Sequence, residues 1–160
     1  MLSYKTVEEI LFKLEPDRER ILVIGIGNSA RQDDGVGWKF LELIDALGLP
    51  LEYREVYQLQ IEDASLITGF DKIIFVDSHV DQIKGGYQLE PVFPLEDATW
   101  TTHTLSPAGL MHLAEQLFDH TPEAWLLAIT GYRWDLGEPM TADAKANLFE
   151  AFEFLRVQLG

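Results

Sequence analysis

The chain has 160 residues, which suits one domain with a substantial core and leaves too little for two ordinary domains. Its 27 acidic and 12 basic residues give a formal net charge of −15, and such a field repels nucleic acid and anionic membrane surfaces. Cysteine is absent, which excludes disulfides, thiol catalysis and thiolate metal sites. No apolar run is long enough to span a membrane and the N-terminus is unlike a signal peptide, so we expect a cytoplasmic protein. No long heptad pattern argues for assembly, so we expect a monomer.

Strand and helix patterns alternate along the chain. An amphipathic helix that ends near Pro16 is expected first, as an extension over residues 1–19. The strands that follow are predicted at 21–27, 51–59, 72–77, 87–93 and 125–130, with the fourth at an edge because it contains Pro91. The remaining helices are predicted at 36–47, at 61–68, after the Ser106-Pro107 start, and from Thr141 to the C-terminus.

This alternation predicts one three-layer α/β domain over residues 1–160, of the phosphorylase/hydrolase-like kind. Its twisted sheet of about five strands should be mostly parallel and flanked by helices, because the strongest strand patterns are apolar on both faces. Ligands of such sheets bind beyond the carboxyl ends of the strands, so the functional residues are expected in the loops that follow them.

The first such loop, "GIGNSARQDDGVG" (25–37), is rich in glycine, as phosphate-binding turns are. A nucleotide is nevertheless disfavoured, because Asp33 and Asp34 would stand beside a diphosphate, which needs positive potential and free amides. A plain structural role is available instead, since an aspartate just before a helix caps free N–H groups and complements the helix dipole.

Further metal-binding side chains follow other predicted strands. Asp77 ends the run "KIIFVD", and His103 lies in "TTHTLSPAGL", just before the Ser106 cap. With Asp34 they form a set of oxygen and nitrogen ligands suited to a divalent transition ion. Each also has an ordinary explanation, as a cap, a turn former or a surface histidine, and residue types alone leave both interpretations open.

Four segments in this order resemble the hydrogenase maturation proteases, the endopeptidases that process nickel–iron hydrogenase large subunits. The segments are "GIGNSARQDDGVG", "IIFVDSH", "THTLSPAGL" and "AITGYRWDLGEPMTADAKANL", and the resemblance covers roughly residues 20 to 158. The resemblance implies that Asp34, Asp77 and His103 engage nickel already inserted in the precursor, with Asp34 and Asp77 catalytic. It also implies a metal-dependent, aspartyl-type hydrolase that activates its hydrogenase by removing a short C-terminal peptide, with no nucleotide cofactor.

The other residues of the first motif would support the turn. The resemblance gives this role to Gly25, Gly27 and Gly35, and to Asn28 through local hydrogen bonds. Asp33 is either a general base beside the metal or simply a cap, and the sequence does not decide between them.

Three other functions remain open from the sequence. The chain could be a nucleotide- or small-molecule-binding α/β module, or a chaperone that senses nickel-loaded precursor without cutting it. Peptidyl-tRNA hydrolases also begin with a strand and a Gly-x-Gly-Asn turn, but they continue with Pro-Gly and need a basic face for RNA. Here Asn28 is followed by Ser29-Ala30, and the net charge is −15.

Overall fold

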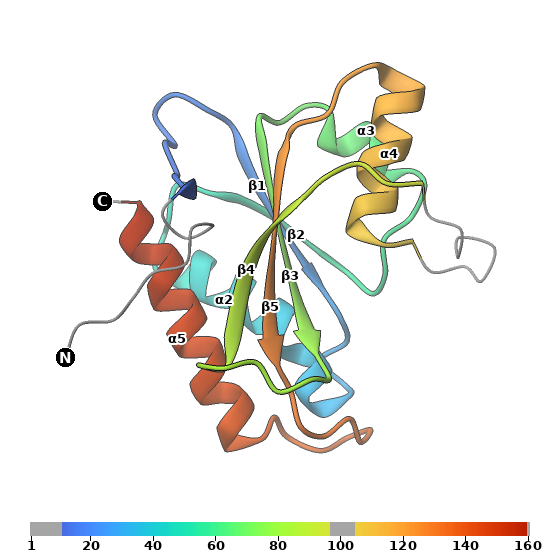
Figure 1. Ribbon diagram of the computed structural model, residues 1–160. Coiled ribbons are helices and arrows are strands. Elements are labelled where there is room, and N and C mark those ends of the chain that lie inside the picture. Colours follow the sequence, from blue (N-terminus) through green and yellow to red (C-terminus); the bar gives the residue numbers. More distant parts are fainter. Residues whose placement is uncertain (1–10, 97–104, 160) are drawn as a thin grey trace.

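Strands and helices alternate along the chain as predicted (Figure 1), in a computed structural model that describes residues 11–96 and 105–159. In chain order the elements are β1 (Ile21–Ile26), the 3₁₀ turn η1 (Gln32–Gly35), α2 (Val36–Ala46), β2 (Glu52–Val56), α3 (Asp63–Ile67), β3 (Lys72–His79), β4 (Tyr87–Val92), α4 (Pro107–Phe118), β5 (Glu123–Thr130) and α5 (Ala142–Gln158). The expected helix starts are also present, because Ser106 and Thr141 cap α4 and α5 through side-chain oxygens that accept backbone N–H bonds.

The five strands form one sheet in the order β2-β1-β3-β5-β4. The pairs β1–β2, β1–β3 and β3–β5 are parallel, and only β4 runs antiparallel, against β5. The predicted mostly parallel α/β sheet is therefore confirmed. The edge position of β4 is confirmed too, and it suits Pro91, which has no N–H to donate to a further strand.

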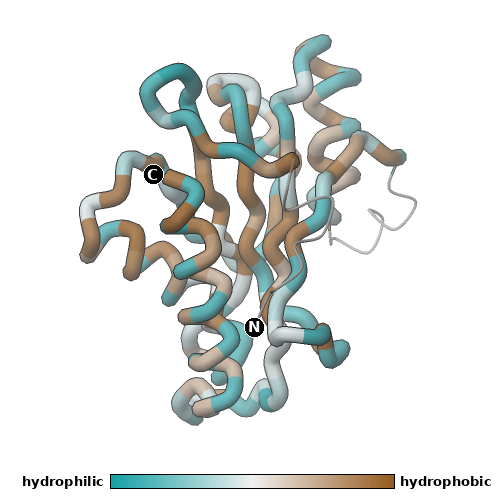
Figure 2. Tube along the Cα trace, turned by 60° about the vertical axis from the view of Figure 1, so that its left-hand side comes forward, coloured by the Kyte–Doolittle hydropathy of each residue, from teal (hydrophilic) through white to brown (hydrophobic). Residues whose placement is uncertain are grey.

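Helices cover both faces of the sheet (Figure 1), α2 and α5 on one face and α3 and α4 on the other. Successive residues of the central strands point to opposite faces, so Val23 joins the core under α2 and α5 while Leu22 and Ile24 join the other core. Figure 2 shows the result as hydrophobic colour along the strands and hydrophilic colour on many of the outer turns. The central strands therefore need apolar residues at nearly every position.

The segment of residues 12–20 differs from its prediction. Residues 1–10 of the expected helix lie outside the described residues, and residues 12–20 form an irregular stretch and a turn rather than a helix. Phe12 is only 1% exposed, with its ring edge-on to Trp125 at 5.2 Å and stacked on Phe154 at 5.9 Å. The apolar residues of this stretch are therefore buried in the domain's core without helical geometry.

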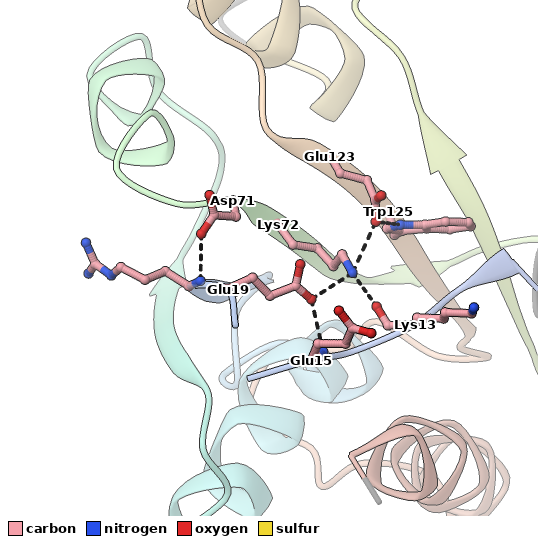
Figure 3. A network of polar contacts seen from close by, with 8 residues as sticks. Lys13, Glu15, Glu19, Asp71, Lys72, Glu123 and Trp125 are labelled. Carbon is pink, nitrogen blue, oxygen red and sulfur yellow. Dashed lines mark hydrogen bonds and ion pairs between the residues drawn. The ribbon is translucent and has the colours of Figure 1, made fainter. Parts of the chain in front are cut away.

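A buried lysine also ties this segment to the sheet (Figure 3). The Lys72 ammonium, at the start of β3, lies 2.9 Å from a Glu19 carboxylate oxygen and 3.3 Å from one of Glu123, and it donates to the Lys13 carbonyl oxygen. Because breaking a buried pair leaves an uncompensated charge, this network holds the segment in place. Among the described residues, no helix is long and apolar enough to cross a bilayer.

Candidate functional site

The carboxyl ends of β1, β3 and β5 lie along one edge of the sheet, because these strands run parallel and in register. The loop from β1 to α2 and the last residues of β3 meet at this edge. Asp34 lies in the 3₁₀ turn η1, and Asp77 lies near the end of β3. The fold thus brings together two of the predicted site residues that are 43 positions apart in the sequence.

The glycines of the β1–α2 loop accommodate the protein's own backbone. Gly27 has a φ of 144°, and a Cβ there would lie 2.0 Å from the carbonyl oxygen of Asp34. A Cβ on Gly37 would lie 2.7 Å from the carbonyl oxygens of Ile26 and Val76, so α2 packs directly on β1 and β3. The space that a phosphate would use beside Gly27 is therefore filled by the loop itself.

Asn28 stabilises the same loop through its backbone and its side chain. Its N–H donates to the Asp34 carbonyl oxygen at 3.1 Å, and its side-chain oxygen accepts the Ala30 N–H at 2.9 Å. The first of these bonds fixes the backbone of Asp34 directly. Gly25 and Gly35 are equally constrained, since a Cβ on Gly25 would lie 2.5 Å from the Gly37 carbonyl oxygen and one on Gly35 would lie 3.0 Å from Ser29 Cα.

Asp33 points away from the site and into the protein. Its side chain is 0% exposed and accepts four hydrogen bonds, from the N–H groups of Tyr132, Arg133 and Thr141 and from the Thr141 hydroxyl, at 2.8 to 3.1 Å. Burial alone would raise the pKa of Asp33, but these hydrogen bonds together lower it. The carboxylate therefore joins the β1–α2 loop to the β5–α5 loop, and it has no surface from which to act as a general base on a substrate.

The simple capping role does not fit either aspartate. The N-cap positions are Arg31 for η1 and Gly35 for α2, and neither makes a side-chain cap hydrogen bond in the described part of the chain. Asp33 instead supports the start of α5, because the Thr141 hydroxyl that donates to it also accepts the Ala144 N–H at 3.2 Å. The position of Asp34 at the sheet edge thus needs another explanation.

Ser78 connects the two aspartates that do lie at the edge. Its hydroxyl donates to Asp34 Oδ1 at 3.2 Å, and its N–H donates to Asp77 Oδ1 at 2.8 Å. Sequence reasoning did not single out this serine as a functional residue. Its position directly after the aspartate that ends a buried strand was the only indication available.

Asp77 has a strongly perturbed acidity. Burial raises its pKa to about 7, the Ser78 N–H opposes the rise, and the nearby charge of Asp34 adds to it. Asp34 and Asp77 repel each other when both are ionised, and a bound cation would reduce this repulsion. A group with a pKa near 7 can also exchange protons at neutral pH.

The third predicted ligand, His103, lies outside the described residues. The chain re-enters the described region at Leu105, which forms an isolated bridge with Leu59 in the loop after β2. His79 is placed two residues after Asp77, where its Nδ1 accepts the Asp81 N–H at 3.0 Å. Within residues 11–96 and 105–159 no group of three His, Asp or Glu side chains is close enough to hold a metal ion. The described part of the site is therefore the pair Asp34 and Asp77.

A separate apolar groove of about 420 Å³ lies at the opposite edge of the sheet. It is lined by Leu11, by residues 91–94 at the end of β4, and by residues 121–125 at the start of β5. It shares no residue with the acidic pair, and its lining offers only one ionisable side chain, Glu123.

The fold and this edge define a three-layer α/β protein with an acidic pair where such sheets bind ligands. No protein-family model matches the sequence, and no curated protein matches it either. Solved structures do match over most of the chain, and several of them are NiFe hydrogenase maturation proteases.

Three of these structures give the extent of the similarity. HycI from Thermococcus kodakarensis matches with a TM-score of 0.71 and 21% identity, over 96% of this chain and 99% of its own. HybD from the same organism matches with a TM-score of 0.66 and 21% identity, over 88% and 99%. HybD from E. coli matches with a TM-score of 0.63 and 20% identity, over 85% and 89%. At these identities the similarity establishes a shared fold.

Proposed function

We propose that this chain is an endopeptidase that removes a short C-terminal peptide from the nickel-loaded precursor of a nickel–iron hydrogenase large subunit. The observation that carries the proposal is the pairing of Asp34 and Asp77 through Ser78, at the ligand-binding edge of a fold shared with maturation proteases. The four sequence segments that resemble that family support it independently.

Recognition in this proposal depends on the nickel that the precursor carries. Asp34 and Asp77 present carboxylates to it and His103 presents an imidazole, a mixed ligand set that suits a divalent transition ion. A precursor without nickel would leave the two carboxyl groups facing each other and would bind weakly.

Cleavage needs a group that takes a proton from the attacking water and returns one to the leaving amine. In the metal-free protein Asp77 has a pKa of about 7, so it is suited to both transfers while it is not itself bound to the nickel. Asp34 then holds the metal centre of the substrate, in an orientation set by the Ser78 hydroxyl and by the Asn28 bond to its backbone. Asp33 contributes by anchoring the loop and not by contact with the substrate.

The test is a cleavage assay read by mass spectrometry. The chain is mixed with large-subunit precursors from the same genome, each prepared with and without nickel, beside Asp34→Asn and Asp77→Asn variants. Asp81→Asn is the matched control, because it removes an exposed carboxylate near the same edge. We expect loss of a C-terminal peptide from nickel-loaded precursor only, abolished by either site variant and kept by the control.

The assay also distinguishes the alternatives. Tight binding of nickel-loaded precursor without cleavage would contradict the protease and favour a sensing chaperone. A chain that neither binds nor cuts any precursor, but binds a nucleotide, would favour the α/β binding module.

A further inference from the structure

Beside the acidic pair lies an aromatic surface formed by Trp38 and Tyr57. Trp38 is in the first turn of α2, four residues after Asp34, and Tyr57 directly follows the end of β2. The carbonyl oxygen of Val56 accepts the Gly27 N–H at 3.0 Å and the Trp38 indole N–H at 3.1 Å. The two rings are therefore attached to the same backbone that shapes the β1–α2 loop.

Of the two aromatic rings, that of Trp38 is held in place by the protein and that of Tyr57 is exposed to solvent. The indole of Trp38 is half-buried and held by its hydrogen bond, and the ring of Tyr57 packs on it with centroids 5.0 Å apart. Tyr57 is nevertheless 69% exposed, and no hydrogen bond joins its hydroxyl to another residue in the described part of the chain. By contrast, Tyr53 donates to Asp45, and the Tyr132 hydroxyl accepts from Asn147. A large ring fixed in place and presented to solvent is typical of an anchor for a protein partner.

Charge indicates the kind of partner that this surface fits. The loops at this edge carry exposed side chains of both signs, Arg31 and Arg133 beside Asp135, so the acidic pair Asp34 and Asp77 is the part of the edge that favours a cationic group. A polypeptide that presents a cationic centre with apolar side chains next to it would match both the carboxylates and the rings. A nickel-loaded precursor presents a cationic centre, with its own polypeptide next to it, at the place where cleavage is proposed.

We infer that Trp38 and Tyr57 form an aromatic ledge that binds the precursor polypeptide next to its metal centre and so contributes to substrate specificity. This inference rests on the proposed function, because the occupant of the ledge is the proposed substrate. The ledge supplies binding energy from the polypeptide, whereas the acidic pair engages the metal. Loss of the ledge should consequently weaken substrate binding and leave the chemical step intact.

The experiment measures cleavage kinetics and precursor binding for the full chain and for Tyr57→Ala, with Tyr57→Phe to retain the ring. Phe93→Ala is the matched control, since Phe93 is similarly exposed at 72% but lies in the groove at the opposite edge. We expect Tyr57→Ala to raise KM and Kd for nickel-loaded precursor about tenfold with kcat unchanged. Tyr57→Phe should stay within about threefold of the wild type and Phe93→Ala should match it.

Three outcomes overturn the ledge while the proposed function stands. In the first, the wild type cleaves the precursor and Tyr57→Ala has the same KM. In the second, kcat falls and KM does not change, which would place Tyr57 in the chemistry rather than in binding. A larger loss of binding in Phe93→Ala than in Tyr57→Ala would also overturn it, by moving the docking surface to the opposite edge. A wild type that neither binds nor cleaves any nickel-loaded precursor would overturn the proposed function and the ledge together.

Discussion

Replacing Asp77 by asparagine should stabilise the protein at alkaline pH while abolishing activity. Its carboxyl group has a pKa of about 7 in the folded protein against an ordinary value of 3.8. Between these values the folded state binds more protons than the unfolded state, so the free energy of unfolding falls as the pH rises. The contribution of Asp77 is fully favourable below pH 3.8 and is lost as the pH passes through about 7.

The size of the effect follows from the same two values. At about 1.4 kcal/mol for each pH unit, the loss between pH 5 and pH 8 is at most about 2.5 kcal/mol. The measured value should be smaller, because Asp77 is partly exposed and solvent screens its charge. Asparagine cannot ionise, so the stability of Asp77→Asn relative to the wild type should grow by about 1 to 2.5 kcal/mol over this range.

Urea unfolding of both proteins at several pH values, in the presence of a chelator, provides the assay. Comparing the two proteins at each pH cancels the titration of all other groups. The control is Asp17→Asn, which removes an exposed carboxylate in the turn before β1 and should show no such growth. If the wild type and Asp77→Asn lose stability in parallel from pH 5 to pH 8, then Asp77 is not held in a repulsive, desolvated site, and its proposed role in proton transfer loses its basis.

Four further variants test the loops and the core around the site. Asp33→Asn should cost about 3 kcal/mol in urea unfolding at pH 7, because an amide cannot accept all four hydrogen bonds. The cost should shrink as the pH falls through the lowered pKa of Asp33, and a cost independent of pH would contradict its ionised role. Gly27→Ala should lower the melting temperature through about 1 to 3 kcal/mol of loop strain, and an unchanged melting temperature would show that the contact with Asp34 relaxes easily. Ser78→Ala should reduce kcat/KM about fivefold without unfolding the protein, whereas full activity would mean that Asp34 is oriented by other groups. Phe12→Ala should cost about 3 to 5 kcal/mol in chemical unfolding, and a cost near zero would show that this segment lies outside the cooperative core.

Much of the fold was predictable because it depends on local patterns. The runs at β1, β3 and β5 are apolar at almost every position, which only a strand buried on both faces requires. Ser106 and Thr141 marked helix starts because a cap depends on the residue itself and its next few neighbours. Leu47 shows the limit of such patterns. The pattern predicts a helix over residues 36–47 and Leu47 shares its apolar spacing, yet α2 ends at Ala46 and Leu47 is 56% exposed.

The role of Asp33 was decided only by tertiary structure. The family resemblance assigned the metal contact to Asp34, whereas for Asp33 the sequence left a cap and a general base both open. In the fold, Asp33 accepts hydrogen bonds from Tyr132 and Thr141, which are about a hundred positions away, and Asp34 meets Ser78. No local pattern encodes partners so distant in the chain.

The sequence by itself thus determined the class of fold, and it predicted that Asp34 and Asp77 come to the carboxyl edge of the sheet, where we propose the site. It did so because strand burial, helix caps and the ends of parallel strands are consequences of short stretches of residues. The tertiary structure alone decided that Asp33 is buried as an anchor and that the pKa of Asp77 is raised to about 7. It also decided that the rings of Trp38 and Tyr57 lie beside the acidic pair. These properties depend on burial and on distant hydrogen-bond partners, which exist only once the chain has folded.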